Sequence, residues 1–417
     1  MTRKLKIAFY FNDRKNYTAG PTINAIRVLK ELHKRGHDVY PLVEYFEDYT
    51  STKELIALGI KCYITPYEKY TSDAVKWFNK TLQEINPDIW VPNYSCRAGF
   101  ASKNLLDVGV PCFFTHRSDD DLNWGQALFF SKNKNGFNHS NIICVSEYLK
   151  NELESKTKRS DSEVIPSGVP QSSHISNQKN EILSLVYSGR LAEKQKRFSE
   201  LLNHFSKIHK KNEKIKLTVI GGDNAQIKYY ENITKDLKIK SKVIFKGFMS
   251  GSTYHEELSK HNCLILMSDY EGTPGSVMDG MSCGLIPIVL RYNGVNEIIE
   301  HGVNGFILET RDDLQAAVEA VFDKPKFKIK LSQNAVKKFN ENYSLNATVD
   351  KWEKLFRKYV PANKPIVNFQ NKIVLPRKNK MLREDIRFDL FDHNHLHMKV
   401  FHKAKKILSI LLRNKTK

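Results

Sequence analysis

The stretch SDYEGTPGSVMDGMSCGLIPIV, residues 268–289, decides how the rest of this chain is interpreted. An apolar run at 263–267 precedes the stretch and a second run, 286–290, ends it, so the pattern predicts a strand, a glycine-rich loop, a helix and another strand. Gly272 and Gly275 allow backbone angles that are closed to other residues. The loop can therefore bring backbone amides close to a bound ligand.

Two carboxylates, Glu271 and Asp279, stand eight residues apart across this loop. Pro274 fixes its own φ and has no N–H, and Ser276 is expected to cap the helix that follows. Free amides at a helix N-terminus favour a bound anion, and ionised carboxylates accept hydrogen bonds from sugar hydroxyls. The pattern predicts a site for a ligand with an anionic group and several hydroxyls. A surface turn with two solvated acids is the alternative.

The stretch resembles the Glu-x7-Glu signature of the retaining family 4 glycosyltransferases, which have the GT-B fold and use nucleotide-sugar donors. Asp279 stands where the family usually has its second Glu, so its side chain is shorter by one methylene. The resemblance implies that Glu271 is catalytic and holds donor sugar hydroxyls, while Asp279 contacts the ribose. It also implies that the loop between the two carboxylates lines the donor sugar and ribose with Gly272, Thr273, Pro274, Gly275 and Ser276.

The length of 417 residues favours two or three domains, and a composition of 41% apolar and 27% charged residues is typical of a soluble globular protein. No apolar run reaches the ~20 residues of a transmembrane helix and no signal peptide is recognised, so a cytoplasmic protein is expected. The six cysteines, without a CxxC pair, are predicted to be reduced core residues. The net charge of +20 implies an anionic partner.

The N-terminal part of the chain predicts the opening of a doubly wound sheet. A short apolar strand at 6–11 is followed by a loop around Gly20, an amphipathic run at 23–35 and a second strand that starts near Val39. In the resembled family this glycine-containing loop lies in the cleft between the domains, so Gly20 is expected near the donor phosphates or the acceptor. The GxGxxG dinucleotide fingerprint is absent, which argues against a nicotinamide enzyme.

Polar residues follow the apolar run at 111–115, where the carboxyl end of a parallel strand is expected. Ligands of open α/β sheets gather at such strand ends, and His116 matches a histidine that members of the family carry near the donor sugar. A structural or exposed histidine is the alternative. The acids at 119–121 resemble the Asp-x-Asp metal motif of the other glycosyltransferase architecture, GT-A, but are expected to be solvated, so no metal site is predicted.

A basic loop follows the strand predicted at 183–188. Arg190 and Lys196 match the family's basic pair that binds the donor diphosphate. An arginine fork and a lysine point charge suit a diphosphate whose negative charge grows as the sugar leaves. Lys194 is an alternative to Lys196 because the loop is rich in lysine, and a solvated basic turn is the other interpretation.

The predicted fold class is α/β, with two Rossmann-like, doubly wound domains that face an inter-domain cleft, as in GT-B. The expected limits are 1–170 for an acceptor-side domain, 171–180 for a linker, 181–345 for a nucleotide-sugar-binding domain and 346–417 for a closing helix with a basic tail. The last residues, 397–417, combine lysines with apolar residues at helical spacing and contain no acid. They predict either an interfacial helix on an anionic membrane or a helix packed on the N-terminal domain.

The resemblance implies a retaining, metal-independent hexosyltransferase that needs no cofactor. It would move a sugar from a nucleotide-diphosphate sugar, such as a UDP-sugar, to a hydroxyl of a glycan or lipid-linked acceptor. The expected setting is bacterial cell-envelope or surface polysaccharide biosynthesis, with the enzyme in the cytoplasm or peripheral at the inner face of the cell membrane. The alternatives are a basic nucleic-acid-binding protein and another GT-B relative without this transfer activity.

Nucleic acid is not expected as the partner, because the sequence carries no helix-turn-helix, zinc-finger or RNP-like motif. The donor sugar and its base, the acceptor, the linkage position and the oligomeric state do not follow from the sequence. The sequence therefore predicts that the donor is a nucleotide sugar, but not which sugar or which nucleotide it contains.

Overall fold

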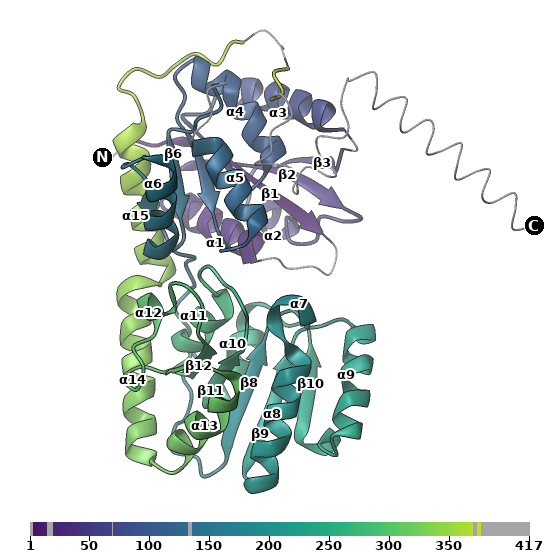
Figure 1. Ribbon diagram of the computed structural model, residues 1–417. Coiled ribbons are helices and arrows are strands. Elements are labelled where there is room, and N and C mark those ends of the chain that lie inside the picture. Colours follow the sequence, from purple (N-terminus) through teal and green to yellow (C-terminus); the bar gives the residue numbers. More distant parts are fainter. Residues whose placement is uncertain (1–2, 15–19, 69, 132–135, 370–372, 377–417) are drawn as a thin grey trace, which may run out of the picture. The chain divides into compact units, whose positions relative to one another are not determined.

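The computed structural model describes residues 3–14, 20–68, 70–131, 136–369 and 373–376. The chain divides into two compact units, each with helices packed around a sheet (Figure 1). Unit 1 comprises Met1–Val145, Lys150–Val164 and Trp352–Lys417, and unit 2 comprises Ser146–Leu149 and Ile165–Lys351. The basic tail predicted at 397–417 lies outside the described residues.

Unit 1 is built on a seven-stranded sheet with the strand order β3-β2-β1-β4-β5-β6-β7, in which all pairs are parallel. Its strands are β1 (Lys6–Arg14), β2 (Asp38–Phe46), β3 (Tyr63–Pro66), β4 (Ile89–Asn93), β5 (Cys112–His116), β6 (Asn141–Cys144) and β7 (Glu163–Val164). Its helices include α1 (Gly20–Lys34), α2 (Lys53–Ala57), α3 (Thr71–Ile85), α4 (Cys96–Asp107) and α5 (Asp121–Ser131). The strand, helix and strand predicted at the start of the chain are confirmed as β1, α1 and β2.

The core of unit 1 is completed by a segment from far along the chain. Strand β1 is buried over most of its length, as expected for a parallel strand covered on both faces. Helix α15 (Leu345–Tyr359) packs on this sheet, with the ring centroids of Trp352 and Phe9 5.8 Å apart and those of Phe356 and Phe113 5.5 Å apart. Two helices, α15 and α6 (Glu147–Thr157), have residues in both units.

Unit 2 is built on a six-stranded parallel sheet with the order β10-β9-β8-β11-β12-β13. Its strands are β8 (Leu183–Ser188), β9 (Ile215–Ile220), β10 (Val243–Gly247), β11 (Cys263–Leu266), β12 (Ile286–Leu290) and β13 (Phe306–Leu308). Its helices are α7 (Glu193–Lys196), α8 (Phe198–Lys211), α9 (Asn224–Asp236), α10 (Gly251–Ser259), α11 (Gly275–Ser282), α12 (Val295–Ile298), α13 (Leu314–Phe322) and α14 (Pro325–Asn342), with short 3₁₀ turns at Lys240–Lys242 and Arg311–Asp313. The doubly wound α/β fold predicted for both halves is confirmed.

The core of unit 2 lies on both faces of its sheet because side chains alternate along each strand. On β8, Leu185 and Tyr187 pack on one side with residues of α8, α9 and α13. Val186 points to the other side, where residues of α10, α11 and α14 pack. This double cover explains why the strands are continuous apolar runs in the sequence.

The polar segment 171–180, expected as a linker, makes hydrogen bonds within unit 2. The amide of Gln178 donates to the carbonyl oxygens of Asn262 (3.2 Å) and Gly284 (2.9 Å), which precede β11 and β12. The hydroxyl of Ser176 donates to the carbonyl of His261. The segment therefore holds together the loops that lead into two strands.

Two expectations drawn from composition can be compared with the structure. All six cysteines are free thiols, as predicted, and five of them are buried, whereas Cys62 is only half-buried and not a core residue. Across the ranges of the chain that the structure describes, no helix combines the length and the apolar character needed to cross a membrane.

In both sheets the strand order reverses beside the first strand of the unit, between β1 and β4 and between β8 and β11. Adjacent loops leave the sheet in opposite directions at such a point, and this opens a crevice at the carboxyl ends of the two strands. These strand ends are therefore where each unit is expected to bind a ligand.

Candidate functional site

The carboxyl end of β8 is shaped by glycines that no larger residue can replace. Gly221, at the end of β9, has φ +128°, and a Cβ there would lie 2.0 Å from the carbonyl oxygen of Gly189. Gly189 has φ +154° and donates its N–H to Ile220 at 3.0 Å. A side chain at position 221 would therefore displace the backbone that leads directly to Arg190.

Lys196 and Glu271 form a buried ion pair, although they are 75 residues apart in the sequence. Lys196 is the last residue of α7, which follows β8, and Glu271 follows β11, so the pairing of β8 with β11 brings the two side chains together. Their side chains are only 11% and 10% exposed. Lys194, the alternative left open by the sequence, is exposed to solvent.

Gln195 connects Arg190 to the loop that carries Glu271. Its side-chain oxygen accepts from Arg190 Nη2 at 3.0 Å, and its side-chain nitrogen donates to the carbonyl of Tyr270 at 2.9 Å. Its own carbonyl accepts from the N–H of Asp269 at 3.0 Å. Gln195 was not among the predicted site residues, because one glutamine among lysines has no distinctive pattern.

Two buried tyrosines flank Glu271. Burial, together with the charge of the Glu271 carboxylate, raises the pKa of Tyr187 and of Tyr292 well above the usual value. Both phenols are therefore neutral at pH 7. Tyr187 donates its hydroxyl to the carbonyl of Arg190 at 2.5 Å, whereas the buried hydroxyl of Tyr292 has no partner in the described part of the chain. The Glu271 carboxylate is therefore close enough to two buried, neutral phenols to influence both of them.

Asp269 anchors the start of the same loop from outside the ion pair. Its carboxylate accepts from Arg197 Nε at 2.6 Å and from Arg311, which also pairs with Glu200 at 3.0 Å. The hydrogen bond that Arg197 donates to Asp269 raises the pKa of the Arg197 guanidinium above its usual value. Asp269 is therefore a positioning residue for the loop.

Of the predicted loop, Gly272, Thr273 and Pro274 lie between β11 and α11, whereas Gly275 and Ser276 are the first residues of α11. Helix α11 begins at Gly275 with Pro274 as its N-cap, and the N–H groups of Val277 and Met278 donate to the carbonyl of Pro274 at 3.0 and 3.3 Å. The prediction that Ser276 caps the helix is therefore wrong, since Ser276 lies inside the first turn. Pro274 takes this place because its fixed φ of −69° suits the entry to a helix.

Asp279 lies in the second turn of α11 and is buried, with 6% of its surface exposed. Its Oδ1 lies 3.1 Å from Nε2 of His255 on α10. The sequence did not single out His255, because it lies 24 residues before Asp279 and in no recognisable motif. The second carboxylate of the predicted signature thus has its own partner.

His116 ends β5 in unit 1 and is fully buried. Neither ring nitrogen has a hydrogen-bond partner among the residues that the structure describes. Burial lowers the pKa of His116 to about 4, against the opposing effect of the Asp120 and Asp119 carboxylates, so the imidazole is neutral at pH 7. Its ring lies edge-on to that of Trp124, with 4.4 Å between centroids.

The acids at 119–121 have local partners. Asp119 accepts from the indole N–H of Trp124 at 2.6 Å, and Asp120 accepts from the N–H of Asn123 at 2.9 Å at the start of α5. Within the described ranges, no group of three or more His, Cys, Asp or Glu side chains is arranged to hold a metal ion. Gly20 is the exposed first residue of α1. The structure therefore brings Arg190, Lys196 and Glu271 together in unit 2, while His116 and Gly20 belong to unit 1.

Two family models match the chain. The model of Glycosyltransferase Family 4 matches residues 20–172, and the model of Glycosyl transferases group 1 matches residues 170–338. With the two Rossmann-like sheets described above, the chain belongs to the group 1 glycosyltransferases and has the GT-B fold. The family resemblance seen in the sequence is confirmed.

Particular relatives are distant. The chain is 29% identical over 163 residues to an uncharacterised glycosyltransferase of Methanocaldococcus jannaschii, covering 38% of this chain and 41% of that protein. It is 25% identical over 247 residues to the lipopolysaccharide 1,6-galactosyltransferase of Escherichia coli, covering 56% of this chain and 65% of that protein. The chain thus spans less than two thirds of the length of these relatives.

A solved structure of Anabaena HepE in complex with UDP-glucose has a similar fold. The TM-score is 0.68 at 16% sequence identity, and the match covers 85% of this chain and all of that chain. At this identity the similarity establishes the fold alone.

Proposed function

We propose that this chain is a retaining glycosyltransferase that moves a sugar from a UDP-sugar to an acceptor hydroxyl without a metal ion. The observation that carries this proposal is the buried pair of Lys196 and Glu271, to which Gln195 connects Arg190. Two cations and a carboxylate at the switch point between β8 and β11 suit a ligand that combines a diphosphate with a hydroxylated ring.

The roles of the charged groups follow from their chemistry. Arg190 and Lys196 bind the diphosphate and stabilise the charge that develops on it as the sugar leaves. Glu271 then accepts hydrogen bonds from donor sugar hydroxyls in place of Lys196, and Asp279, held by His255, accepts from the ribose. The UDP complex of a protein with the same fold supports the choice of uridine.

The proposed reaction breaks the bond between the anomeric carbon and the diphosphate oxygen. The acceptor oxygen bonds to that carbon from the same face, and the acceptor proton passes to the departing diphosphate oxygen. No side chain is needed as a general base, and the cations of Arg190 and Lys196 take the place of a metal ion. His116 belongs to this proposal because a neutral, buried imidazole whose two nitrogens have no partner among the described residues can hydrogen-bond to a sugar hydroxyl.

Nucleotide binding and product analysis test the proposal. UDP should raise Tm, with about 2.7 kcal/mol of stabilisation when its concentration is 100 times Kd. A screen of UDP-, GDP- and ADP-sugars by product mass should then identify the donor, and NMR of the product should show the anomeric configuration of the donor. No change in Tm with any of the three nucleotides would contradict the proposed donor class, and an inverted product would contradict retention.

The proposed setting is cell-envelope polysaccharide synthesis, with the enzyme in the cytoplasm and the segment 397–417 on the inner face of the membrane. The E. coli relative acts on lipopolysaccharide, and a basic amphipathic segment attracts anionic lipid. Truncation after Pro376 removes only residues beyond the described ones. The shortened protein should keep UDP binding but no longer sediment with anionic vesicles at low salt. If full-length protein does not sediment with them either, the membrane proposal fails.

A further inference from the structure

Arg117 is a buried cation for which the described residues supply no counter-ion. It directly follows β5, and 9% of its surface is exposed. Its Nε donates to Asn93 Oδ1 at 3.0 Å and to Thr115 Oγ1 at 3.1 Å. In the described part of the chain, no carboxylate lies within ion-pair distance of Arg117 and neither Nη nitrogen has a hydrogen-bond partner.

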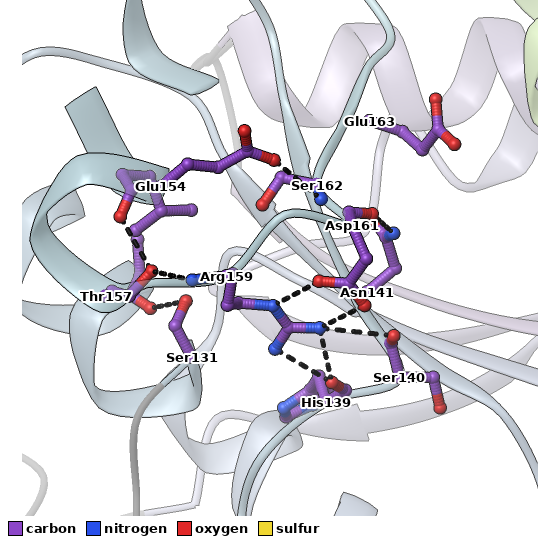
Figure 2. A network of polar contacts seen from close by, with 12 residues as sticks. Ser131, His139, Ser140, Asn141, Glu154, Thr157, Arg159, Asp161, Ser162 and Glu163 are labelled. Atoms are coloured by element: carbon purple, nitrogen blue, oxygen red, sulfur yellow. Dashed lines mark hydrogen bonds and ion pairs between the residues drawn. The ribbon is translucent and has the colours of Figure 1, made fainter. Parts of the chain in front are cut away.

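Other arginines of the same unit are paired. Arg97, 2% exposed, lies 3.3 Å from the buried carboxylate of Glu44 and over the ring of Tyr67 at 4.1 Å. Arg159 bonds to Asp161 at 2.8 Å and to the carbonyls of His139 and Ser140, as Figure 2 shows. These two guanidinium groups hold the fold together, whereas the two Nη nitrogens of Arg117 bond to none of the residues that the structure describes.

The groups around Arg117 fix its direction. Asn93 ends β4 in a left-handed conformation, with φ +55°, which asparagine tolerates better than other side chains. Its amide donates to the carbonyl of Tyr10 at 3.3 Å, and its Oδ1 accepts from both Thr115, at 2.8 Å, and Arg117. Strand β4 lies at the switch point of the sheet beside β1, so this cluster stands where unit 1 is expected to bind a ligand.

Burying a charge without a counter-ion is costly, and proteins usually avoid it. Burial lowers the pKa of Arg117 to about 10, against the opposing effect of Tyr94, so the group is still charged at pH 7. Beyond the two hydrogen bonds of its Nε, this charge has no partner among the described residues that would offset the cost of its burial. Its two Nη nitrogens, which have no partner among the described residues, have the geometry that binds a carboxylate or phosphate in a bidentate way.

We propose that Arg117 binds an anionic group, a phosphate or a carboxylate, on the acceptor substrate. The proposal rests on the proposed function, in which the donor diphosphate already has Arg190 and Lys196 in unit 2. An anion bound by unit 1 is then one that the acceptor brings. The enzyme would therefore prefer a phosphorylated sugar or a uronic acid over a neutral sugar as its acceptor.

Anion binding is measured by calorimetry on full-length protein with saturating UDP, which occupies the donor phosphate site. Inorganic phosphate and glucuronate are the two probes, one for a phosphorylated and one for a carboxylated acceptor. At least one of them should bind the wild type, and Arg117→Met should weaken that binding tenfold or more, since a charge-assisted bidentate contact is lost. Arg117→Lys should keep part of the affinity, because it retains the charge but not the fork.

Arg159→Met is the matched control. Arg159 is comparably buried, with 13% of its side chain exposed, but is bonded within the fold. It should keep the anion affinity within twofold while its Tm falls by several degrees. Arg117→Met should keep or raise Tm, because it removes an unpaired charge and leaves no carboxylate without its partner.

The outcomes separate this inference from the proposed function. If UDP does not bind the wild type, the proposed function fails. If UDP binds but neither probe does, or if Arg117→Met binds the probe as tightly as the wild type, the anion site is refuted and the donor site is unaffected. A fall in Tm of Arg117→Met as large as that of Arg159→Met would show that Arg117 is structural.

Discussion

The two units differ in whether the polar side chains at the carboxyl ends of their strands have partners within the described residues. In unit 2 the carboxylates of the site have partners, since Lys196 pairs with Glu271 and His255 lies against Asp279. In unit 1 the comparable strand ends hold His116, with two unpartnered ring nitrogens, and Arg117, with no carboxylate beside it in the described residues.

This difference bears on how each unit meets a ligand. A ligand of unit 2 has to replace the ion pair between Lys196 and Glu271. Its binding energy is therefore the difference between its own contacts with these two side chains and the contact that they make with each other in the free protein. A ligand of unit 1 would satisfy groups that the fold leaves unsatisfied, so those groups lower the stability of the free protein. Removing a site residue should therefore impair function in unit 2, whereas in unit 1 it should raise the stability of the free protein.

The largest expected effect is on catalysis by unit 2. Glu271→Gln keeps the shape of the side chain but loses the charge that accepts sugar hydroxyls and that neutralises Lys196. Losing one charge-assisted contact in the transition state costs about 2–4 kcal/mol, so kcat should fall roughly a hundredfold. Product formation under saturating donor measures this effect.

The matched control for this substitution is Glu257→Gln, on α10. Glu257 is also buried, with 6% exposed, and is also paired with a lysine, Lys260 at 3.1 Å. Its substitution should lower stability and leave kcat within a factor of two. Equal losses of kcat in the two variants would remove Glu271 from the proposed active site.

The next largest effect is the loss of stability at low pH that the buried His116 of unit 1 should cause. The pKa of His116 is about 4 in the folded chain and ~6.5 when unfolded, so between these pH values only the unfolded state binds the proton. The free energy of unfolding therefore falls as the pH falls through this window, by at most about 3 kcal/mol from this residue. His116→Gln should show a correspondingly smaller loss of stability between pH 7 and pH 4.

Urea unfolding at a series of pH values measures this dependence. His33→Gln, at an exposed position of α1, is the control and should follow the wild-type curve. If His116→Gln follows the same curve as the wild type, His116 does not stay neutral in the folded chain. The buried imidazole would then not lower the stability of unit 1, and in this respect the two units would not differ.

A smaller effect should separate the two lysines of the α7 loop. Lys196 is buried against Glu271 and Lys194 is exposed, so Lys196→Gln should weaken UDP binding about tenfold and Lys194→Gln less than twofold. Calorimetric titration with UDP measures both. The reverse order would assign the diphosphate to Lys194.

No effect at all is expected from chelation. Because Arg190 and Lys196 supply the positive charge in the proposed mechanism, turnover should be the same with and without EDTA. A loss of turnover that Mg²⁺ or Mn²⁺ restores would show that a metal ion supplies the charge, and Asp119 to Asp121 would be the first residues to substitute.

The fold and the donor loop could be read from the sequence because their signals are local. The apolar runs that became β1, β8 and β11 and the Gly-Thr-Pro-Gly turn each occupy a few consecutive residues. The partners of the site residues could not be read in this way. Lys196 differs from Lys194 only through its distance from Glu271, and His255 meets Asp279 only because α10 packs on α11.

The sequence also could not predict that Arg117 has no carboxylate partner among the described residues. An arginine after a strand is usually paired, and only the placement of Asn93 and Thr115 shows that their neutral oxygens take the place of a carboxylate. The wrong prediction of the helix cap has a local cause. Both Ser276 and Pro274 are compatible with a helix start, and the backbone conformation of the loop places Pro274 at the N-cap.

Unit 1 also sets a constraint on synthesis of the chain. Trp352 and Phe356 cover Phe9 and Phe113, yet about 190 residues, Ile165–Lys351, are translated between them and the rest of that unit. At about 5–20 residues per second, the sheet of the nascent protein waits roughly 10–40 s on the ribosome with one apolar face uncovered. The first unit to emerge is therefore the last to be completed, and for that interval the apolar side chains that α15 later covers remain exposed.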